Sequence, residues 1–167
     1  MVFHGMKRRD IISWSIDEEA FQYLSWMRME RPKPNEFAFA SLLSVCGNIA
    51  MLEQGRHLHA HVLSIGLDNI AIVRSALINK YSKCGSIKEA LTIFDEVEYD
   101  DIVSWTTMIN GYAELGYSRE AIDLFKKLPR VGLKLDSMTF IGVLTACGHA
   151  ALIDLGFYYF NSMSKEY

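Results

Sequence analysis

The feature that most restricts the fold of this chain is an internal repeat. Residues 102–136 contain two apolar patterns with helical spacing, and residues 71–101 align with them at a shift of 31 positions. The identical pairs are Ile78 with Ile109, Tyr81 with Tyr112, Gly85 with Gly116, Ala90 with Ala121, and Phe94 with Phe125. Glycine and aromatic matches in constant register indicate that both stretches adopt the same structure.

Each full unit is predicted to be a helical hairpin. In residues 102–136 the first apolar stripe consists of Trp105, Met108, Ile109 and Tyr112, and the second of Ala121, Ile122, Leu124, Phe125 and Leu128. Gly116 ends the first pattern, and Ser118 is the expected N-cap of the second helix. Pro129 and Gly132 end that helix. A single hairpin buries too little apolar surface to be stable alone, so it needs neighbours.

A second type of unit flanks these two. Residues 36–70 align with residues 137–167 at a shift of 101 positions. The identical pairs are Phe39 with Phe140, Leu43 with Leu144, Cys46 with Cys147, Gly47 with Gly148, and Gly55 with Gly156. The chain is therefore predicted to be one continuous all-α solenoid, in which each hairpin packs on the next.

Two incomplete units are predicted before residue 36. Residues 1–10 align with residues 92–101, which makes them the tail of a unit whose first helix is absent. Residues 11–35 align at both ends with residues 102–136, but ten residues of the first helix are missing. We expect only the second helix of that unit, near residues 17–30, to remain as a full element. The last unit lacks its final residues, and we expect the chain to be a piece of a longer array.

Composition argues against some classes of function. The net charge is −3 and the isoelectric point is about 5.9, whereas a cationic clamp for nucleic acid is usually basic. Any nucleic-acid binding must therefore rest on base contacts or on a local basic patch. Cys46, Cys84 and Cys147 suggest a reducing compartment rather than a disulfide framework. No apolar run approaches the ~20 residues of a membrane span, so no membrane partner is predicted.

The repeat resembles the pentatricopeptide repeat family of plants, in the class that combines P, L and S motifs. The stretches that carry the resemblance are FASLLSVCGNIAMLEQGRHLHAHVLSIGL for L, SALINKYSKCGSIKEALTIFDEV for S and SWTTMINGYAELGYSREAIDLF for P. On this resemblance residues 11–35 and 102–136 are P-type, residues 36–70 and 137–167 are L-type, and residues 1–10 and 71–101 are S-type. The implied fold is a right-handed α-solenoid of helix-turn-helix repeats, similar to tetratricopeptide arrays.

The resemblance implies that the chain binds single-stranded RNA, with one base per repeat. In this family the fifth and last residues of a repeat read the base edge, and the second packs against the base face. The implied reading pairs are Thr106 with Asp136, Ser75 with Asp101, and Ser15 with Asn35. The implied packing residues are Val103, Ile72 and Ile12. A hydroxyl beside a carboxylate or amide can form hydrogen bonds with a base edge, which suits this role.

The same resemblance assigns bases to the pairs. Thr or Ser with Asp favours guanine, and Ser with Asn favours adenine, so the implied target is A, any base, G, G from 5′ to 3′. The first L-type unit carries Ala40 and Ile70, which cannot read a base by hydrogen bonds, and has Phe37 at its second position. The last unit has Ile141 at its fifth position and Met138 at its second, and its last position is missing. The alternative interpretation is that the polar pairs are ordinary first-turn helix residues and turn formers.

Catalysis and metal binding are not predicted. His57 and His61 have the helical spacing of a metal pair, with His59 between them, but no third ligand is evident nearby. The matching residues of the last unit are Tyr158, Phe160 and Ser162. We therefore predict a structural role for the histidines and no cofactor. The chain lacks the HxE and CxxC pattern of a zinc nucleotide deaminase, a phosphate-binding glycine loop and an activated nucleophile, so no enzyme activity or small-molecule substrate is predicted.

The sequence leaves two functions open. The first is sequence-selective binding of single-stranded RNA in organellar RNA processing or C-to-U editing, weakened or lost by truncation. The resemblance then implies a mitochondrial or chloroplast location, with editing-complex proteins as further partners. Residues 1–10 lack the length and composition of a transit peptide. The second function is a helical protein–protein interaction scaffold, which the acidic isoelectric point favours.

Overall fold

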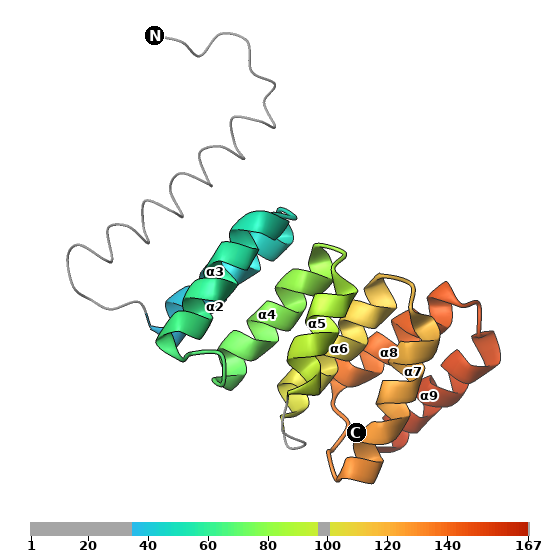
Figure 1. Cartoon of the computed structure of the whole chain (residues 1–167). Coiled ribbons are helices and arrows are strands. Elements are labelled where there is room, and N and C mark those ends of the chain that lie inside the picture. The colour runs from blue at the N-terminus through green and yellow to red at the C-terminus, as the bar shows by residue number, and fades with distance from the viewer. Residues whose placement is uncertain (1–34, 97–100, 167) are drawn as a thin grey trace, which may run out of the picture.

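The structure is a computed structural model that describes residues 35–96 and 101–166, without the side chains of residues 164–166. Its elements are α2 (Glu36–Asn48), α3 (Leu52–Ile65), α4 (Ala71–Lys83), α5 (Ile87–Asp95), α6 (Ile102–Glu114), α7 (Ser118–Lys127), the 3-10 turn η1 (Leu128–Val131), α8 (Ser137–His149) and α9 (Ile153–Glu166). The helices follow one another as hairpins from α2–α3 to α8–α9 (Figure 1). The incomplete units predicted before Asn35 lie outside the described residues.

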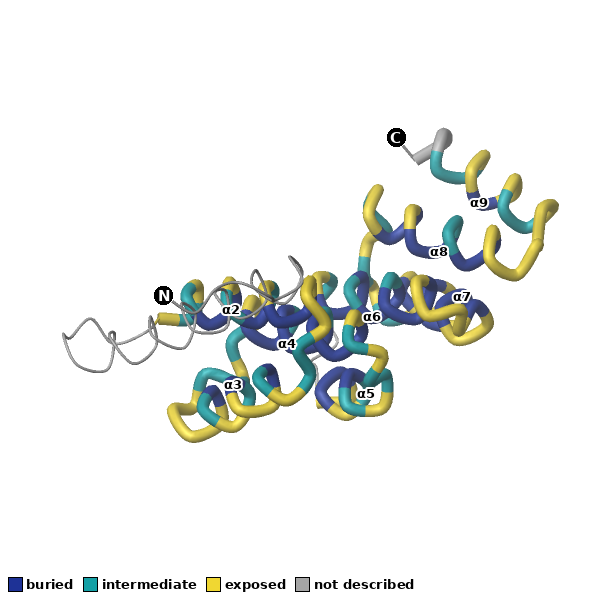
Figure 2. The backbone as a smooth tube through the Cα atoms, turned by 90° about the horizontal axis from the view of Figure 1, so that it is seen from above, coloured by how far each residue is buried: buried dark blue, intermediate teal, exposed yellow. Residues whose placement is uncertain are grey.

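The hairpins are arranged in two layers. The first helices α2, α4, α6 and α8 each pack against the next, and every second helix packs against the first helix of its own hairpin. The second helices α3, α5 and α7 also contact the first helix of the following hairpin. Figure 2 shows α2, α4 and α6 in one row, with α3 and α5 below it. This stacking of hairpins is the arrangement of a helical solenoid.

Small residues bring the first helices close together. Gly111 of α6 faces Ser82 of α4, and a Cβ at Gly111 would overlap the Ser82 side chain. Gly142 of α8 faces Asn110 of α6 in the same way. The Ser82 hydroxyl is buried and has no hydrogen-bond partner within the described residues. Because neighbouring first helices are in direct contact, side chains from successive hairpins share one surface.

The first helix of each hairpin begins where the repeat places a unit. These first residues are Glu36, Ala71, Ile102 and Ser137. Asn35, Asp101 and Asp136 precede three of the helices as N-caps, and their side-chain oxygens accept a backbone N–H of the first turn. α4 follows Ile70 instead and has no side-chain capping bond. Three predicted base-reading residues are thus also helix caps, whereas the division into P, L and S types stays a prediction.

A tight turn of one kind joins the two helices of each hairpin. Gly116 follows α6 in the left-handed conformation with φ 81°, and the Tyr117 N–H donates to the Tyr112 carbonyl oxygen at 2.8 Å. Ala50 and Ala151 occupy the matching place after α2 and α8, with φ of 56° and 53°. An alanine in this conformation is strained, because its Cβ crowds the following carbonyl group. The repeat therefore tolerates a residue other than glycine at this turn.

The prediction that Ser118 is the N-cap of α7 was wrong. Ser118 is the first residue of α7, Tyr117 holds the N-cap position, and no side chain caps the helix. The reason lies in the turn at Gly116, which binds the Tyr117 N–H to the preceding helix. The new helix begins directly after this turn, so the serine falls one position too late to act as a cap.

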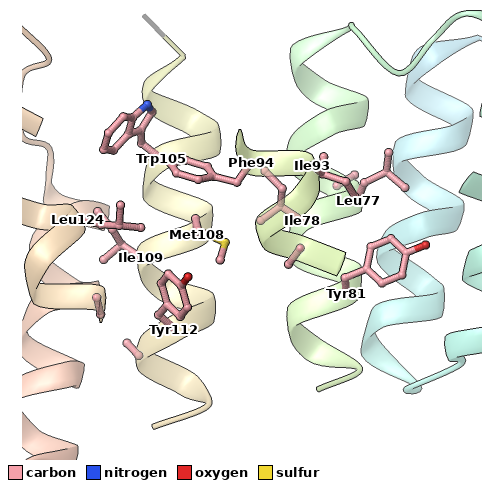
Figure 3. Close-up of a cluster of buried hydrophobic side chains, with 14 of the residues drawn as sticks. Leu77, Ile78, Tyr81, Ile93, Phe94, Trp105, Met108, Ile109, Tyr112 and Leu124 are labelled. Atoms are coloured by element: carbon pink, nitrogen blue, oxygen red, sulfur yellow. The ribbon is translucent and has the colours of Figure 1, made fainter. Parts of the chain in front are cut away.

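The core lies between the layers. The predicted stripes are buried, namely Trp105, Met108, Ile109 and Tyr112 in α6, and Ala121, Ile122, Leu124, Phe125 and Leu128 after it. Phe94 of α5 lies edge-on against Trp105, with ring centroids 5.1 Å apart (Figure 3). Phe125 of α7 contacts the rings of Phe140 and Tyr159 at 5.4 and 5.0 Å. The repeated phenylalanine therefore joins each of these hairpins to the next. Across the described helices, none is both long and apolar enough to span a membrane.

Candidate nucleic-acid interface

Exposed apolar side chains recur at one position of the first-helix layer. The second residue of each first helix is apolar and exposed: Phe37 58%, Ile72 38%, Val103 55% and Met138 51%. Single exposed apolar residues are common on protein surfaces. Four at equivalent positions of helices that contact one another form a series, which suits a partner with repeated flat apolar groups, such as stacked bases.

A groove beside Val103 contains the predicted P-type site. Its volume is about 430 Å³, and its walls come from α4, α6 and the start of α8. The lining residues are Asn79, Ser82, Lys83, Val103, Thr106, Thr107, Asn110, Gly111, Glu114, Asp136 and Met138. The structure therefore brings together the predicted packing residue Val103 and the predicted reading pair Thr106 and Asp136.

Hydrogen bonds connect this pair through Thr139, which is not among the predicted site residues. Thr106 Oγ1 lies 3.1 Å from Thr139 Oγ1, and the Thr139 hydroxyl also donates to Asp136 Oδ1. The same carboxylate oxygen accepts the Thr139 backbone N–H at 2.7 Å. Thr139 is fully buried, whereas Thr106 retains 8% exposure at the groove. The Asp-x-x-Thr spacing at a helix start, which is typical of reciprocal capping, was the available signal.

The S-type pair is connected differently. Ser75 Oγ donates to the Ile72 carbonyl oxygen at 3.2 Å. Asp101 accepts the Ser104 backbone N–H at 3.2 Å and the Ser104 hydroxyl at 2.6 Å. In the part of the chain that the structure describes, no hydrogen bond joins Ser75 to Asp101 or to Ser104. The two reading pairs have similar side chains, but only Thr106 and Asp136 are linked through a buried hydroxyl.

The other predicted positions, in the two units that begin at residues 11 and 36, form no complete reading pair within the described residues. Asn35 is exposed and caps α2, accepting the Ala38 backbone N–H at 3.0 Å. Its predicted partner Ser15 and the packing residue Ile12 lie outside the described residues. Ala40 of the first L-type unit is buried at 8% exposure and offers no side-chain hydrogen bond. Neither the sequence nor the structure therefore supports base reading in that unit.

The charges near the groove are mixed. Lys83 lines it together with the acidic residues Glu114 and Asp136, and the Lys83 ammonium donates to Asn48 Oδ1 at 2.6 Å. Lys80, on the same helix, is turned inward and fully buried. Its ammonium donates to the Leu52 carbonyl oxygen at 3.2 Å and does not add positive charge to the surface. This groove therefore offers hydrogen-bonding groups and apolar surface rather than a cluster of positive charges for phosphate contacts.

The three histidines of α3 have separate surroundings. His59 Nδ1 lies 3.0 Å from the Tyr81 hydroxyl, and burial lowers the pKa of His59, with a further contribution from the positive charge of Lys80. The His61 ring lies against Phe39, with centroids 5.5 Å apart. Within the described residues, no group of three or more His, Cys, Asp or Glu side chains could hold a metal ion. The contacts of His59 and His61 are those of packing residues.

Together the hairpin array and its grooved first-helix layer define a helical-repeat protein of the solenoid class. Residues 72–102 match the PPR repeat, and residues 100–149 match the PPR repeat family. A putative pentatricopeptide repeat-containing protein of Arabidopsis thaliana, At3g47840, is 58% identical over 100% of this chain and 25% of its own length. Another, At3g23330, is 40% identical over 99% of this chain and 25% of its own length. These similarities support a plant pentatricopeptide repeat protein.

Two more proteins match most of the chain. The Arabidopsis protein named "Pentatricopeptide repeat-containing protein At2g03880, mitochondrial" is 36% identical over 99% of this chain and 28% of its own length. The crystal structure of the pentatricopeptide repeat protein PPR10 from maize matches 86% of this chain and 21% of its own, with a TM-score of 0.64 and 23% identity. This match confirms the predicted α-solenoid fold class. The chain spans about a quarter of the length of the relatives it matches.

Proposed function

We propose that this chain binds single-stranded RNA with sequence selectivity, in organellar RNA processing or C-to-U editing. The observation that carries the proposal is the groove in which Val103, Thr106 and Asp136 meet. Val103 offers an apolar surface to a base face, while the hydroxyl and the carboxylate offer hydrogen bonds to its edge. The family similarity and the mitochondrial name of one relative support an organellar setting.

The expected affinity is low. Each base contact contributes on the order of 1–3 kcal/mol, and only two reading pairs lie wholly within the described residues. Ordering a flexible strand opposes this gain. Among the described residues that line the groove, Lys83 is the one lysine or arginine. Few phosphates would therefore be neutralised, and the salt dependence of binding should be shallow. We expect at best micromolar binding, which further repeats of a longer array would strengthen.

Asp136→Asn tests the proposal directly. Asparagine also caps helices well, so α8 should stay intact while a carboxylate acceptor becomes an amide with a donor. In the RNA CCACGGCC, the second G is the base assigned to Thr106 and Asp136. We expect the variant to shift preference at this base from G toward A by about fivefold or more. Fluorescence anisotropy with the G and A versions of this RNA measures the ratio.

Asp123→Asn supplies the matched control. Asp123 is exposed on α7, so the same change of charge is made away from the groove. This control should keep the parent preference. If the parent and Asp136→Asn bind both RNAs equally, or neither binds any RNA, base reading by this chain is refuted.

A protein-binding scaffold is the second candidate function. The observation that favours it is the apolar surface of the α8–α9 hairpin, where Ile153, Phe157 and Phe160 are 68%, 64% and 50% exposed. Proteins of an editing complex are the partners that this candidate would imply. The two functions can be separated by experiment, because Phe157 does not line the groove. Replacing Phe157 by serine should leave the ratio of the G and A affinities unchanged and should weaken the attachment of a protein partner.

A further inference from the structure

The proton positions in the Thr106–Thr139–Asp136 chain can be deduced from its geometry. Each threonine hydroxyl has one hydrogen to donate, and a carboxylate accepts only. The Thr139 hydroxyl is within hydrogen-bond distance of both Asp136 Oδ1 and Thr106 Oγ1. Thr139 is fully buried, so water does not compete for its hydrogen.

The carboxylate is the stronger acceptor for that hydrogen. A hydrogen bond from a hydroxyl to a charged oxygen is about twice as strong as one between two neutral groups. The Thr139 hydrogen is therefore directed to Asp136 Oδ1. The 3.1 Å contact between the two threonine hydroxyls then requires Thr106 to be the donor.

This arrangement determines what the groove presents to a base. Because its hydrogen points toward Thr139, Thr106 Oγ1 offers only lone pairs to the groove. Asp136 Oδ2 accepts no hydrogen bond from any described residue and is a second acceptor. Two acceptors match the adjacent N1–H and N2–H donors of guanine. Adenine places the N1 lone pair on the same edge, where it would face another acceptor.

We propose that Thr139 is a specificity-determining residue for RNA, acting by holding Thr106 as a hydrogen-bond acceptor. Thr139 does not line the groove, so it is a positioning residue that acts through Thr106. The inference rests on the proposed RNA-binding function and adds a residue from the following hairpin to the recognition of one base. It explains the choice of guanine by proton positions rather than by the identity of Thr106 and Asp136 alone.

The neighbouring hairpin provides a matched control. Ser104 has the same place relative to its cap Asp101, and it is also fully buried. Its hydroxyl donates to Asp101 Oδ2, while Ser75 donates to the Ile72 carbonyl oxygen instead. A change at Ser104 therefore removes the capping hydroxyl without altering the proton position of a reading residue.

The experiment compares Thr139→Val, Thr139→Ser and Ser104→Ala in the full chain. The readout is the ratio of affinities for CCACGGCC and for the RNA with its second G replaced by A. We expect a parent ratio of about fivefold or more. Thr139→Val should reduce it to below about twofold, because the Thr106 hydrogen can then turn toward adenine N1. Thr139→Ser and Ser104→Ala should keep the parent ratio.

The outcomes separate this inference from the function on which it rests. A parent chain that binds no RNA, or binds both RNAs equally, overturns the proposed function and the inference with it. A discriminating parent and an equally discriminating Thr139→Val variant overturn only the inference. Equal losses in Thr139→Val and Ser104→Ala would assign the effect to helix capping and also overturn it. Circular dichroism verifies folding, and Thr139→Ala replaces the valine variant if that variant does not fold.

Discussion

At the residue scale, buried polar side chains connect α3 with α4. The Lys80 ammonium lies 3.4 Å from the centre of the Tyr81 ring, and the Tyr81 hydroxyl is 3.0 Å from His59 Nδ1. Gly55 makes room for Lys80, because a Cβ there would overlap the lysine chain. Burial lowers the pKa of Lys80 and of His59 and raises the pKa of Tyr81. Each shift favours the uncharged form, so the stability of the contact between α3 and α4 depends on pH.

His59 should make the protein acid-sensitive near neutral pH. Its folded pKa is below the ordinary 6.5, so between these two values the unfolded chain binds a proton that the folded chain does not. Stability should therefore fall as the pH decreases below about 6.5. His59→Gln should flatten this dependence. Urea unfolding at several pH values between about 7.5 and 5.5 measures it, and parallel curves for parent and variant would contradict the assignment.

The sequence predicted side chains whose roles are set by their own repeat, and it missed those set by a neighbouring hairpin. The burial of Trp105 and Phe125 follows from apolar spacing within one unit. Thr139 acquires its importance from Thr106, which lies 33 residues earlier. The inward turn of Lys80 depends on the space left by Gly55 in a different helix. The Asp-x-x-Thr spacing indicates the cap at Asp136, but neither of these contacts between hairpins has a local sequence pattern.

At the element scale, the hairpin turns differ in backbone strain. Gly85 and Gly116 take the left-handed conformation without strain, but Ala50 and Ala151 take it with a Cβ. The alignment of the repeats predicted the residues at which the first helices begin. It did not predict the turns at Ala50 and Ala151, because these positions lack the expected glycine. The wrong N-cap at Ser118 has a similar origin, since the turn before it fixed where α7 begins.

Ala151→Gly should stabilise the chain. The substitution removes the left-handed penalty of about 1–2 kcal/mol, offset by the entropy of glycine in the unfolded chain, for a net gain of about 0.5–1 kcal/mol. Gly116→Ala is the reverse control. Open space surrounds the position where its Cβ would lie, so there is no steric clash, and the backbone strain alone should destabilise the chain by a similar amount. Thermal or chemical unfolding compares the two. A destabilising Ala151→Gly would show that the entropy of the unfolded chain outweighs the strain at this turn.

Phe125→Ala should be among the most damaging single substitutions. The ring is 4% exposed and contacts Phe140 and Tyr159, so its loss opens a cavity between two hairpins. The expected cost is about 3–5 kcal/mol, enough to unfold a short array. Phe157→Ala is the control, since Phe157 is 64% exposed and should change stability by only about 0.5 kcal/mol. Similar unfolding midpoints for both variants would contradict this packing.

At the scale of the whole molecule, stability is shared between neighbouring hairpins. Each hairpin buries its apolar faces only by packing on the next, so a short solenoid has a large fraction of terminal surface. The described part ends in α9, where Ile153, Phe157 and Tyr158 are 68%, 64% and 66% exposed. Such a surface favours association in water.

The isolated chain should therefore associate as its concentration rises. Sedimentation velocity across a concentration series should show a growing average mass, together with a broad thermal transition. Replacing Ile153 and Phe157 by serine should shift the association to higher concentration by about tenfold or more, since each change removes exposed apolar surface. A chain that stays monomeric and melts sharply at every concentration would refute this expectation.

The helix caps have a consequence for how such an array can change over generations. Asp101 and Asp136 each end one unit and cap the first helix of the next, and Asn35 does the same for α2. Good capping residues are few, chiefly Asp, Asn, Ser and Thr, and they differ in which hydrogen-bonding groups they present. Exchange among them alters the chemistry of the surface while the helix start is retained. On the proposed RNA-binding function, single replacements at these caps would change the binding preference and leave the scaffold folded.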